Sequence, residues 1–486
     1  MVRMAAPSLF GSLLKRLTAA VLFALFLGHF FAFGGEFPLP SEDIPRYEIA
    51  LDIDFAEGAF RGMQTIGYLN ATGERLEEIF LRLYPNAPAI FGNGFLSVEE
   101  VRVDGEPIET RAYVGNTVLW VPLPSPLDHG EWIFLELQFD GRTATWEEGS
   151  SSSVGYGIYA TSPRTMTLAT FYPILAVYDE EGWNIDPIAE IGDAVSSDVG
   201  TYTVEVTVDP DLTLLTSGRR VDQWDEGDRR VYRFIGEGMR DFAVVVGKGY
   251  SERSAIVGDV TLRTNFFPEH AQAGEVAMAR VEEVIDLYQQ CFGPFAFDEL
   301  DLVEVPLARA AGVEYPGLIL IAESYSVSPS NRFFDIIIAH EAAHQWWYAV
   351  VGSDVIEEPW LDEALATYSS ALFLEETVGI AVAREVATEW EAAYRSVNAR
   401  YPELSVASPV YRFPDSATYS AFVYSGGAVF LDAVREAIGD AAFFDALAGY
   451  YSDHAFQIAH SVDLLAHFEQ ACGCTLSDIF SQYLEP

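Results

Sequence analysis

Two histidines four residues apart, followed by a more distant glutamate, form the pattern in this sequence with the clearest chemistry. His340 and His344 enclose Glu341 in the segment His-Glu-Ala-Ala-His, and 18 residues separate His344 from Glu363. In a helix, positions i and i+4 lie on one face, so both imidazoles can reach one metal ion. Two histidines and a carboxylate suit zinc and leave a coordination position for water, as in catalytic zinc sites. The pattern therefore predicts zinc bound by His340, His344 and Glu363.

The residue between the histidines has a different expected role. Glu341 is offset from the face that binds the metal but can reach a water molecule beside it, which is the position of the general base in His-Glu-x-x-His hydrolases. The alternative interpretation is an ordinary amphipathic helix with two buried histidines. Glu363 argues against that alternative, because Pro359 marks the start of a second helix that can present this carboxylate to the first one.

Composition excludes one class of partner. The chain has 486 residues, with 73 acidic and 28 basic side chains and a formal net charge of −45. Nucleic-acid binding needs basic surfaces that attract phosphates, so no nucleic-acid partner is expected. Half of the residues are hydrophobic, which supplies a sizeable core, and this length predicts two or three domains.

The first 35 residues have the character of an export segment. Arg3, Lys15 and Arg16 precede an apolar run at 17–33, and acidic residues follow that run. This charge order predicts that the bulk of the chain crosses a membrane. A signal peptide and a retained N-terminal anchor both stay open, with a buried N-terminal helix as the third alternative. We expect an extracytoplasmic protein that is secreted or attached to the membrane only through this segment.

Hydrophobic periodicity changes along the chain. After a proline-containing linker at 36–45, apolar residues alternate at period two through much of 46–250, for example at 47–55 and 201–208, which predicts a β-rich domain. Residues 251–486 are expected to be rich in helices, with a short strand at 300–305. The sequence thus predicts an α+β protein with a β-rich N-terminal domain and an α-rich catalytic domain.

Two further segments complete a family pattern. Ala-Gly-Val-Glu-Tyr-Pro-Gly at 311–317 precedes the zinc motif, and a segment at 419–428 that contains Tyr424 follows it. With these segments in this order around the motif, residues 46–486 resemble the gluzincin zinc aminopeptidases, the family of aminopeptidase N and leukotriene hydrolase. The resemblance implies a saddle-like β domain, a thermolysin-like catalytic domain and one zinc ion per chain.

The resemblance also implies a reaction and its residues. It implies the release of N-terminal residues from peptides with a free N-terminus, by attack of zinc-activated water. The implied roles are zinc ligation by His340, His344 and Glu363, general base catalysis by Glu341, oxyanion stabilisation by Tyr424, α-amine binding by Glu314 and support of the substrate backbone near Gly312.

Three features depart from the family pattern or stay unassigned. The amine-binding motif usually reads Gly-Ala-Met-Glu-Asn or Gly-Gly-Met-Glu, whereas 311–315 keeps the glutamate and changes its neighbours. Gly426 stands where many relatives have a lysine that binds no metal, so no loss of chemistry is expected. A second amine-binding side chain is expected near 170–179, but no residue there is assigned to it.

Two other functions remain as alternatives. Larger relatives add domains after the catalytic one, so we expect a more open cleft here, and a metalloendopeptidase is the first alternative. A non-catalytic interaction protein on the same fold is the second, although the retained ligands, Glu341 and Tyr424 argue against it. Neither the oligomeric state nor the preferred N-terminal residue is predicted. Cys291 is expected either to bond with Cys472 or Cys474, or to remain a thiol like them.

Overall fold

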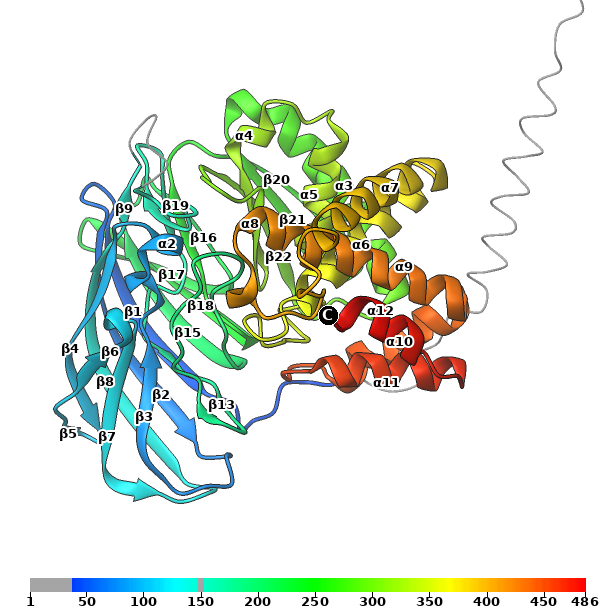
Figure 1. The fold of residues 1–486 in the computed structure, drawn as a ribbon. Coiled ribbons are helices and arrows are strands. Elements are labelled where there is room, and N and C mark those ends of the chain that lie inside the picture. Colours follow the sequence, from blue (N-terminus) through cyan, green and yellow to red (C-terminus); the bar gives the residue numbers. More distant parts are fainter. Residues whose placement is uncertain (1–36, 147–152) are drawn as a thin grey trace, which may run out of the picture. The chain divides into compact units, whose positions relative to one another are not determined.

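The computed structural model describes residues 37–146 and 153–486, of which 39–486 form one compact unit. Strands fill the N-terminal half of this unit and helices dominate the C-terminal half (Figure 1). This arrangement confirms the predicted α+β class. The segment at 1–35 that predicts export or anchoring lies outside the described residues. Within the described part of the chain, no helix is both long and apolar enough to span a bilayer.

The β-rich half is built on one large sheet. Among the described residues it has eight strands, in the order β17 (Arg219–Glu226), β18 (Arg229–Met239), β15 (Gly200–Val208), β1 (Arg46–Asp54), β2 (Ala59–Leu69), β8 (Trp132–Arg142), β4 (Phe95–Val103) and β5 (Glu106–Pro107). Neighbours run antiparallel except β1 and β15, which pair in parallel. Every second residue of β1 is buried, which confirms the predicted alternation at period two.

Smaller sheets and short helices complete this half. A five-stranded sheet has the order β16 (Thr213–Thr216), β19 (Val244–Gly247), β11 (Thr165–Leu168), β10 (Tyr159–Thr161) and β9 (Ala144–Thr145). A four-stranded sheet has the order β12 (Ile174–Leu175), β3 (Leu76–Arg82), β7 (Val118–Leu127) and β6 (Arg111–Tyr113), and β13 (Tyr178–Asp179) pairs with β14 (Gly182–Trp183). The short helices are η1 (Tyr84–Asn86), α2 (Pro88–Phe91) and η2 (Val114–Asn116).

A different sheet opens the second half of the chain. Its order is β20 (Ser251–Val257), β21 (Val260–Phe266), β22 (Glu299–Val305), β24 (Leu318–Ala322) and β23 (Gly312–Tyr315). Strand β22 confirms the short strand expected at 300–305. The last strand of the β-rich half ends at Gly247, and the first strand of this different sheet begins at Ser251. The division into two domains at 250 stays a prediction.

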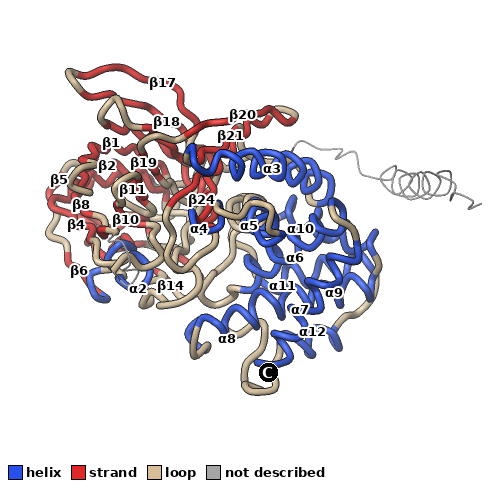
Figure 2. The backbone as a smooth tube through the Cα atoms, turned by 90° about the horizontal axis from the view of Figure 1, so that it is seen from above, coloured by secondary structure: helices blue, strands red, loops and turns tan. Residues whose placement is uncertain are grey.

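The helices gather on the side of the unit opposite the large sheet (Figure 2). Their bounds are η3 (Pro268–His270), α3 (Ala271–Cys291), α4 (Glu323–Ser326), α5 (Arg332–Ala343), α6 (Trp360–Thr377), α7 (Ile380–Asn398), η4 (Val410–Arg412), α8 (Ser416–Ser420), π-helix η5 (Ala421–Gly426), α9 (Gly427–Ile438), α10 (Asp440–Asp453), α11 (Ser461–Cys472) and α12 (Ser477–Leu484).

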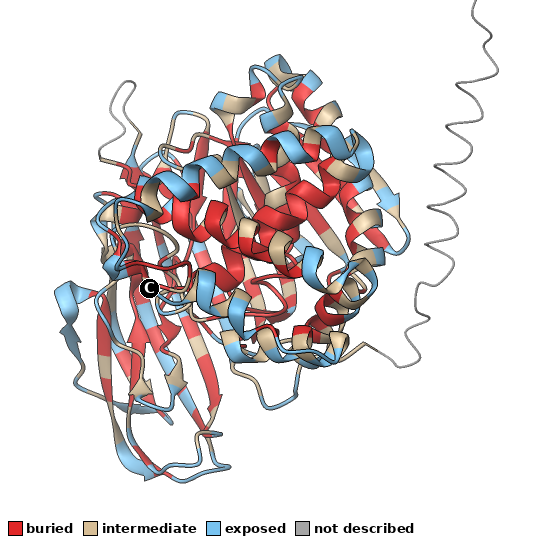
Figure 3. Ribbon diagram, turned by 45° about the vertical axis from the view of Figure 1, so that its right-hand side comes forward, coloured by how far each residue is buried: buried red, intermediate tan, exposed pale blue. Residues whose placement is uncertain are grey.

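Helix α6 is the centre of the helical half. All of its residues from Trp360 to Leu374 are buried, including Asp362 and Glu363 (Figure 3). A helix that is buried all round has neighbours on every side, and α5, α7, α9 and η5 supply them. The polar groups of its first turn are therefore held in a dry environment rather than in solvent.

The expected bond from Cys291 to Cys472 or Cys474 was wrong, as was a free thiol at the latter two, whereas a thiol at Cys291 is confirmed. Cys472 and Cys474 form a disulfide with each other, and Cys291 is a free thiol. The bonded pair flanks Gly473, which has φ +61 and ends α11 in the left-handed region that glycine adopts easily. This local turn brings two cysteines together that sequence spacing alone did not pair.

One buried arginine connects segments that are far apart in the sequence. Arg240 donates from Nε to Tyr348 O at 2.6 Å, from Nη1 to Ser197 O at 3.0 Å, and from Nη2 to Gln457 O at 2.6 Å. Nη2 also donates to Val350 O at 3.2 Å. The guanidinium thus holds a loop of the β-rich half, the loop after α5 and the loop before α11 at one point.

Candidate metal centre and active site

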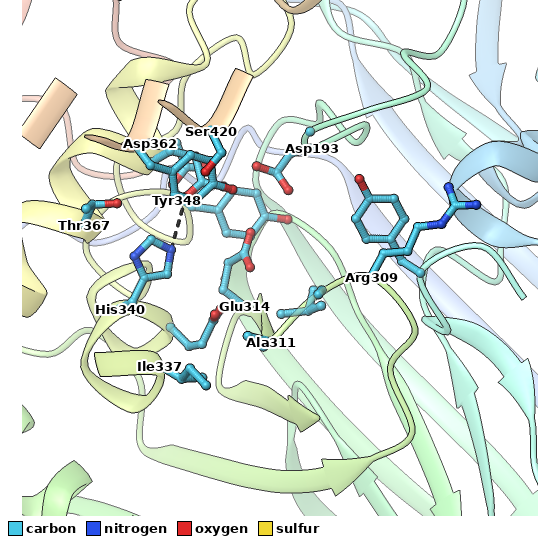
Figure 4. A pocket seen from close by; sticks show the side chains of 18 of the residues that line it. Asp193, Arg309, Ala311, Glu314, Ile337, His340, Tyr348, Asp362, Thr367 and Ser420 are labelled. Carbon is cyan, nitrogen blue, oxygen red and sulfur yellow. Dashed lines mark hydrogen bonds and ion pairs between the residues drawn. The ribbon is translucent and has the colours of Figure 1, made fainter. Parts of the chain in front are cut away.

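Three ligand atoms converge at the predicted zinc site. His340 Nε2 and His344 Nε2 are 3.1 Å apart, and Glu363 Oε2 lies 3.2 Å from the first and 3.6 Å from the second (Figure 4 shows His340). Glu363 Oε2 is buried and receives no hydrogen bond in the described structure. Two imidazoles and a buried carboxylate oxygen without a partner fit a zinc ion, which would supply the missing positive charge.

Helices α5 and α6 bring these atoms together. The side chain of Asn331 caps the start of α5 by accepting from Phe333 N at 3.1 Å. His344 follows the last residue of α5 in helical conformation, so both histidines lie on one face. Glu363 lies in the first turn of α6, and the two helices pack directly on each other.

A second carboxylate orients one of the ligands. His344 Nδ1 lies 2.5 Å from Asp362 Oδ1 and 3.1 Å from Trp347 O, and because both neighbours are acceptors, Nδ1 carries the proton. Nε2 is directed at the ligand cluster and must give up its own proton when a metal binds there, as in other metal sites where a carboxylate supports a histidine ligand. The role of Asp362 was not predicted from the sequence. The only sequence signal for it is its position directly before Glu363.

The charges of the cluster shift its titration. Burial by itself raises the pKa of Glu363, but contact with His340 and the charge of His344 bring it down to about 2. Burial lowers the pKa of His344, yet the charges of Asp362 and Glu314 raise it well above its ordinary value. The ligand carboxylate is thus ionised and attracts a cation.

Tyr424 lies beside the metal ligands. Its hydroxyl donates to Glu363 Oε1, and its ring stacks on His340 with centroids 5.8 Å apart. Tyr424 belongs to π-helix η5, a helix type found mostly at functional sites. A Cβ at Gly427 would stand 2.3 Å from Ala364 Cβ, so the glycine lets this segment approach α6.

Glu341 faces the same centre from α5. Burial raises the pKa of Glu341 to about 8, with the charges of His340 and Glu314 acting in opposite directions. A metal cation would lower this pKa again, because opposite charge favours the ionised carboxylate. Gly312 touches Glu341 closely: a Cβ at Gly312 would lie 2.5 Å from Glu341 Cδ and Oε1. Its lack of a side chain therefore leaves the room that the Glu341 carboxyl group occupies.

A cavity of about 470 Å³ contains the whole constellation. The predicted residues that line it are Gly312, Glu314, His340, Glu341, Glu363 and Tyr424. The structure thus brings all of the sequence-predicted site residues to one place, with His344 directly behind the surface of the cavity. Glu314 lies on β23, where burial raises its pKa well above the ordinary value against the opposing charge of His344.

Two pocket residues were missed by sequence reasoning. Asp193 enters from the loop between β14 and β15 and points into the cavity (Figure 4). Burial and the charges of Glu363 and Asp362 raise its pKa well above the ordinary value. Tyr348 follows the zinc motif and carries a φ of +136, which is unusual for a residue with a side chain. Neither residue belongs to a sequence pattern that could have placed it here.

A second amine-binding side chain was expected from residues 170–179. None of the described residues that line the cavity comes from 170–179, the segment where relatives often supply it. Asp193 and Asp241 are the carboxyl-bearing residues that the β-rich half contributes to the cavity instead. Carboxyl groups outnumber basic side chains in the cavity lining, so a cationic ligand that lowers their pKa values would be favoured there.

The comparisons agree with this geometry. Residues 276–483 match the Peptidase family M1 domain. Probable aminopeptidases 1 and 2 of Sulfurisphaera tokodaii are 21% and 25% identical over 468 and 467 residues, each match covering 91% of this chain and 53% of the relative. The chain therefore spans about half the length of these two relatives.

Solved structures share the fold. The M1 zinc metallopeptidase of Deinococcus radiodurans superposes with a TM-score of 0.65 at 21% identity, over 91% of this chain and 93% of that one. A mutant of it bound to a Tyr-Ser-Ala substrate gives a TM-score of 0.64 at 21% identity, over 91% and 94%. These findings confirm the two-part fold and the resemblance drawn from the sequence. Residues 276–483 thus match the domain of peptidase family M1, and the chain shares the two-part fold of these M1 zinc metallopeptidase structures.

Proposed function

We propose that this protein is a zinc-dependent aminopeptidase that releases N-terminal residues from peptides. The observation that supports the proposal is that one cavity contains both a candidate metal site and a candidate site for the substrate amine. The His340, His344 and Glu363 cluster can bind a catalytic metal, and Glu314 with Asp193 offers carboxyl groups whose ionised form a substrate ammonium would stabilise. The names of the relatives, which are probable aminopeptidases, support this choice.

The chain's own residues account for the proton transfers. Zinc held by the triad would act as a Lewis acid that polarises a carbonyl group and lowers the pKa of water. Glu341 accepts the proton of the attacking water and delivers it to the leaving amine. His344 keeps its orientation through Asp362 during these steps. Gly312 keeps the space of the Glu341 carboxyl group clear.

Tyr424 stabilises negative charge on the former carbonyl oxygen. Burial and the charge of Glu363 raise the pKa of Tyr424 well above its ordinary value, so the hydroxyl keeps its proton and stays a donor. A donor that is preorganised in a buried site costs no rearrangement when charge develops. Its present acceptor, Glu363 Oε1, is replaced by the oxyanion during the reaction.

The number of metal ions and the location of the protein are part of the proposal. We propose one zinc per chain, because the second group able to hold a metal, Glu314 with His344 and Asp362, shares His344 with the first. We also propose an extracytoplasmic location, with membrane attachment only through the N-terminal segment. The charge order around the apolar run at 17–33 supports it, and recovery of the protein in the cytoplasmic fraction of its source would contradict it.

The E341Q variant tests the general base. Glutamine keeps the size of the side chain but cannot accept the proton, so we expect kcat to fall by about 100-fold or more while zinc content stays at the wild-type level. Steady-state kinetics and metal analysis of the same preparation measure both. E283Q on the exposed face of α3 is the matched control. A kcat within a few-fold of wild type would remove Glu341 from this role.

The Y424F variant tests the oxyanion donor. Loss of the hydroxyl removes one preorganised hydrogen bond, so kcat should drop about 100-fold with little change in zinc binding. Y411F, which removes the hydroxyl of an exposed tyrosine bonded to Glu357, should leave kcat unchanged. An unchanged kcat in Y424F would show that the oxyanion is stabilised elsewhere.

Paired peptide substrates separate exopeptidase from endopeptidase action. The native protein should hydrolyse aminoacyl fluorogenic substrates with a free amine, lose this activity with a chelator and spare amino-blocked substrates. The E314A variant should lower kcat/KM for the free-amine substrates by at least about ten-fold, because it removes a buried partner of the ammonium. Equal cleavage of blocked and free peptides by the native protein would favour the endopeptidase alternative.

A further inference from the structure

The backbone at Tyr348 is held in an unusual conformation. Its φ of +136 lies in a region that residues with side chains rarely adopt. Tyr348 N donates to Val351 O at 2.9 Å, and Tyr348 O accepts from Arg240 Nε at 2.6 Å. These contacts maintain a conformation that glycine would adopt with less strain, so the tyrosine side chain is the feature to explain.

That side chain forms part of the cavity wall. Tyr348 is 9% exposed and lines the same cavity as Glu314 and Asp193. Figure 4 shows the carboxyl groups of Glu314 and Asp193 directed into this cavity, and Tyr348 is among the residues that line it.

The phenolic proton of Tyr348 already has an acceptor. The hydroxyl donates to Asp241 Oδ2 at 3.1 Å, and Asp241 is 1% exposed. A tyrosine oxygen can both donate and accept, so a hydroxyl whose proton points to Asp241 keeps its lone pairs for another donor. Glu314 and Asp193 can accept hydrogen bonds but offer none when ionised. The lining of one cavity thus holds three groups that can accept from a ligand.

We propose that Tyr348 Oη is the third hydrogen-bond acceptor for the substrate α-ammonium, beside the carboxylates of Glu314 and Asp193. A primary ammonium carries three N–H donors, so three acceptors satisfy it completely. Asp241 is a positioning residue that fixes the direction of the Tyr348 proton. The site is thereby specific for a primary N-terminal amine over a secondary one. This inference rests on the proposed aminopeptidase function.

The test compares two substrates that differ by one N–H. L-alanyl and N-methyl-L-alanyl amides of the same fluorogenic amine are assayed with the wild-type protein and with Y348F. Phenylalanine keeps the ring but removes the acceptor, so kcat/KM for the primary amine should fall about ten-fold through KM. The N-methyl substrate has two N–H groups for the two remaining acceptors, so the preference for the primary amine should fall by about the same factor.

A control variant and a second test variant are compared with Y348F. Y451F removes a buried hydroxyl that donates to Pro294 O outside the cavity lining, and it should leave the substrate preference unchanged. D241L frees the Tyr348 proton to turn into the cavity, and it should lower the preference in the same direction as Y348F. It also serves as the test if Y348F does not fold.

The possible results separate this inference from the proposed function. A preference that is the same in wild type, Y348F and D241L would overturn the role of Tyr348, and so would a wild type that cleaves both substrates equally well. Hydrolysis of neither substrate by the zinc-loaded wild type would instead refute the aminopeptidase proposal. A fall in kcat without a change in KM or preference would also overturn the inference, because it would place Tyr348 at the reacting bond.

Discussion

The geometry of the cavity depends on the buried guanidinium of Arg240. Removing this cation from water is unfavourable, and burial lowers its pKa. The structure offsets that cost by directing backbone carbonyls of three separate loops at its N–H groups. One of these loops continues to Asp193 and another contains Tyr348, so the same contacts fix both residues relative to the zinc helix. A Cβ at Gly352 would stand 2.1 Å from Arg240 Cζ, which shows how closely the chain surrounds the group.

The metal ligands could be predicted from the sequence because helix geometry is local. Four residues along α5 place His340 and His344 on one face whatever the rest of the chain does. Glu363 needed one further assumption, that α6 packs against α5, and the hydrophobic character of both helices supported it. The base followed from its place between the two histidines, and the oxyanion donor followed only from the resemblance to a family.

The remaining pocket residues could not be predicted, since their positions depend on contacts between distant segments. Asp193 lies in a loop whose path is decided by how the β-rich half packs on the helices, and no local pattern encodes that path. Tyr348 gave no signal because its backbone conformation contradicts local preference and is stabilised by Arg240, more than 100 residues earlier in the chain. The alternation of buried and exposed residues in β1 could be predicted from the sequence. The distribution of the strands among separate sheets could not, because strand pairing is also non-local.

The parallel pairing of β1 and β15 has a consequence for the order of folding. Arg46 pairs with Thr201, so the first strand of the large sheet finds one of its two neighbours only after a very long stretch of chain has been made. Bringing such distant segments together costs loop entropy before any contact compensates for it, and topologies of this kind fold slowly. Helices α5 and α6 are separated by only a short stretch of chain, so bringing them together costs less loop entropy. We therefore expect helices α5 and α6, which hold the metal ligands, to pack early in folding, and the loop that contains Asp193 to reach its place late.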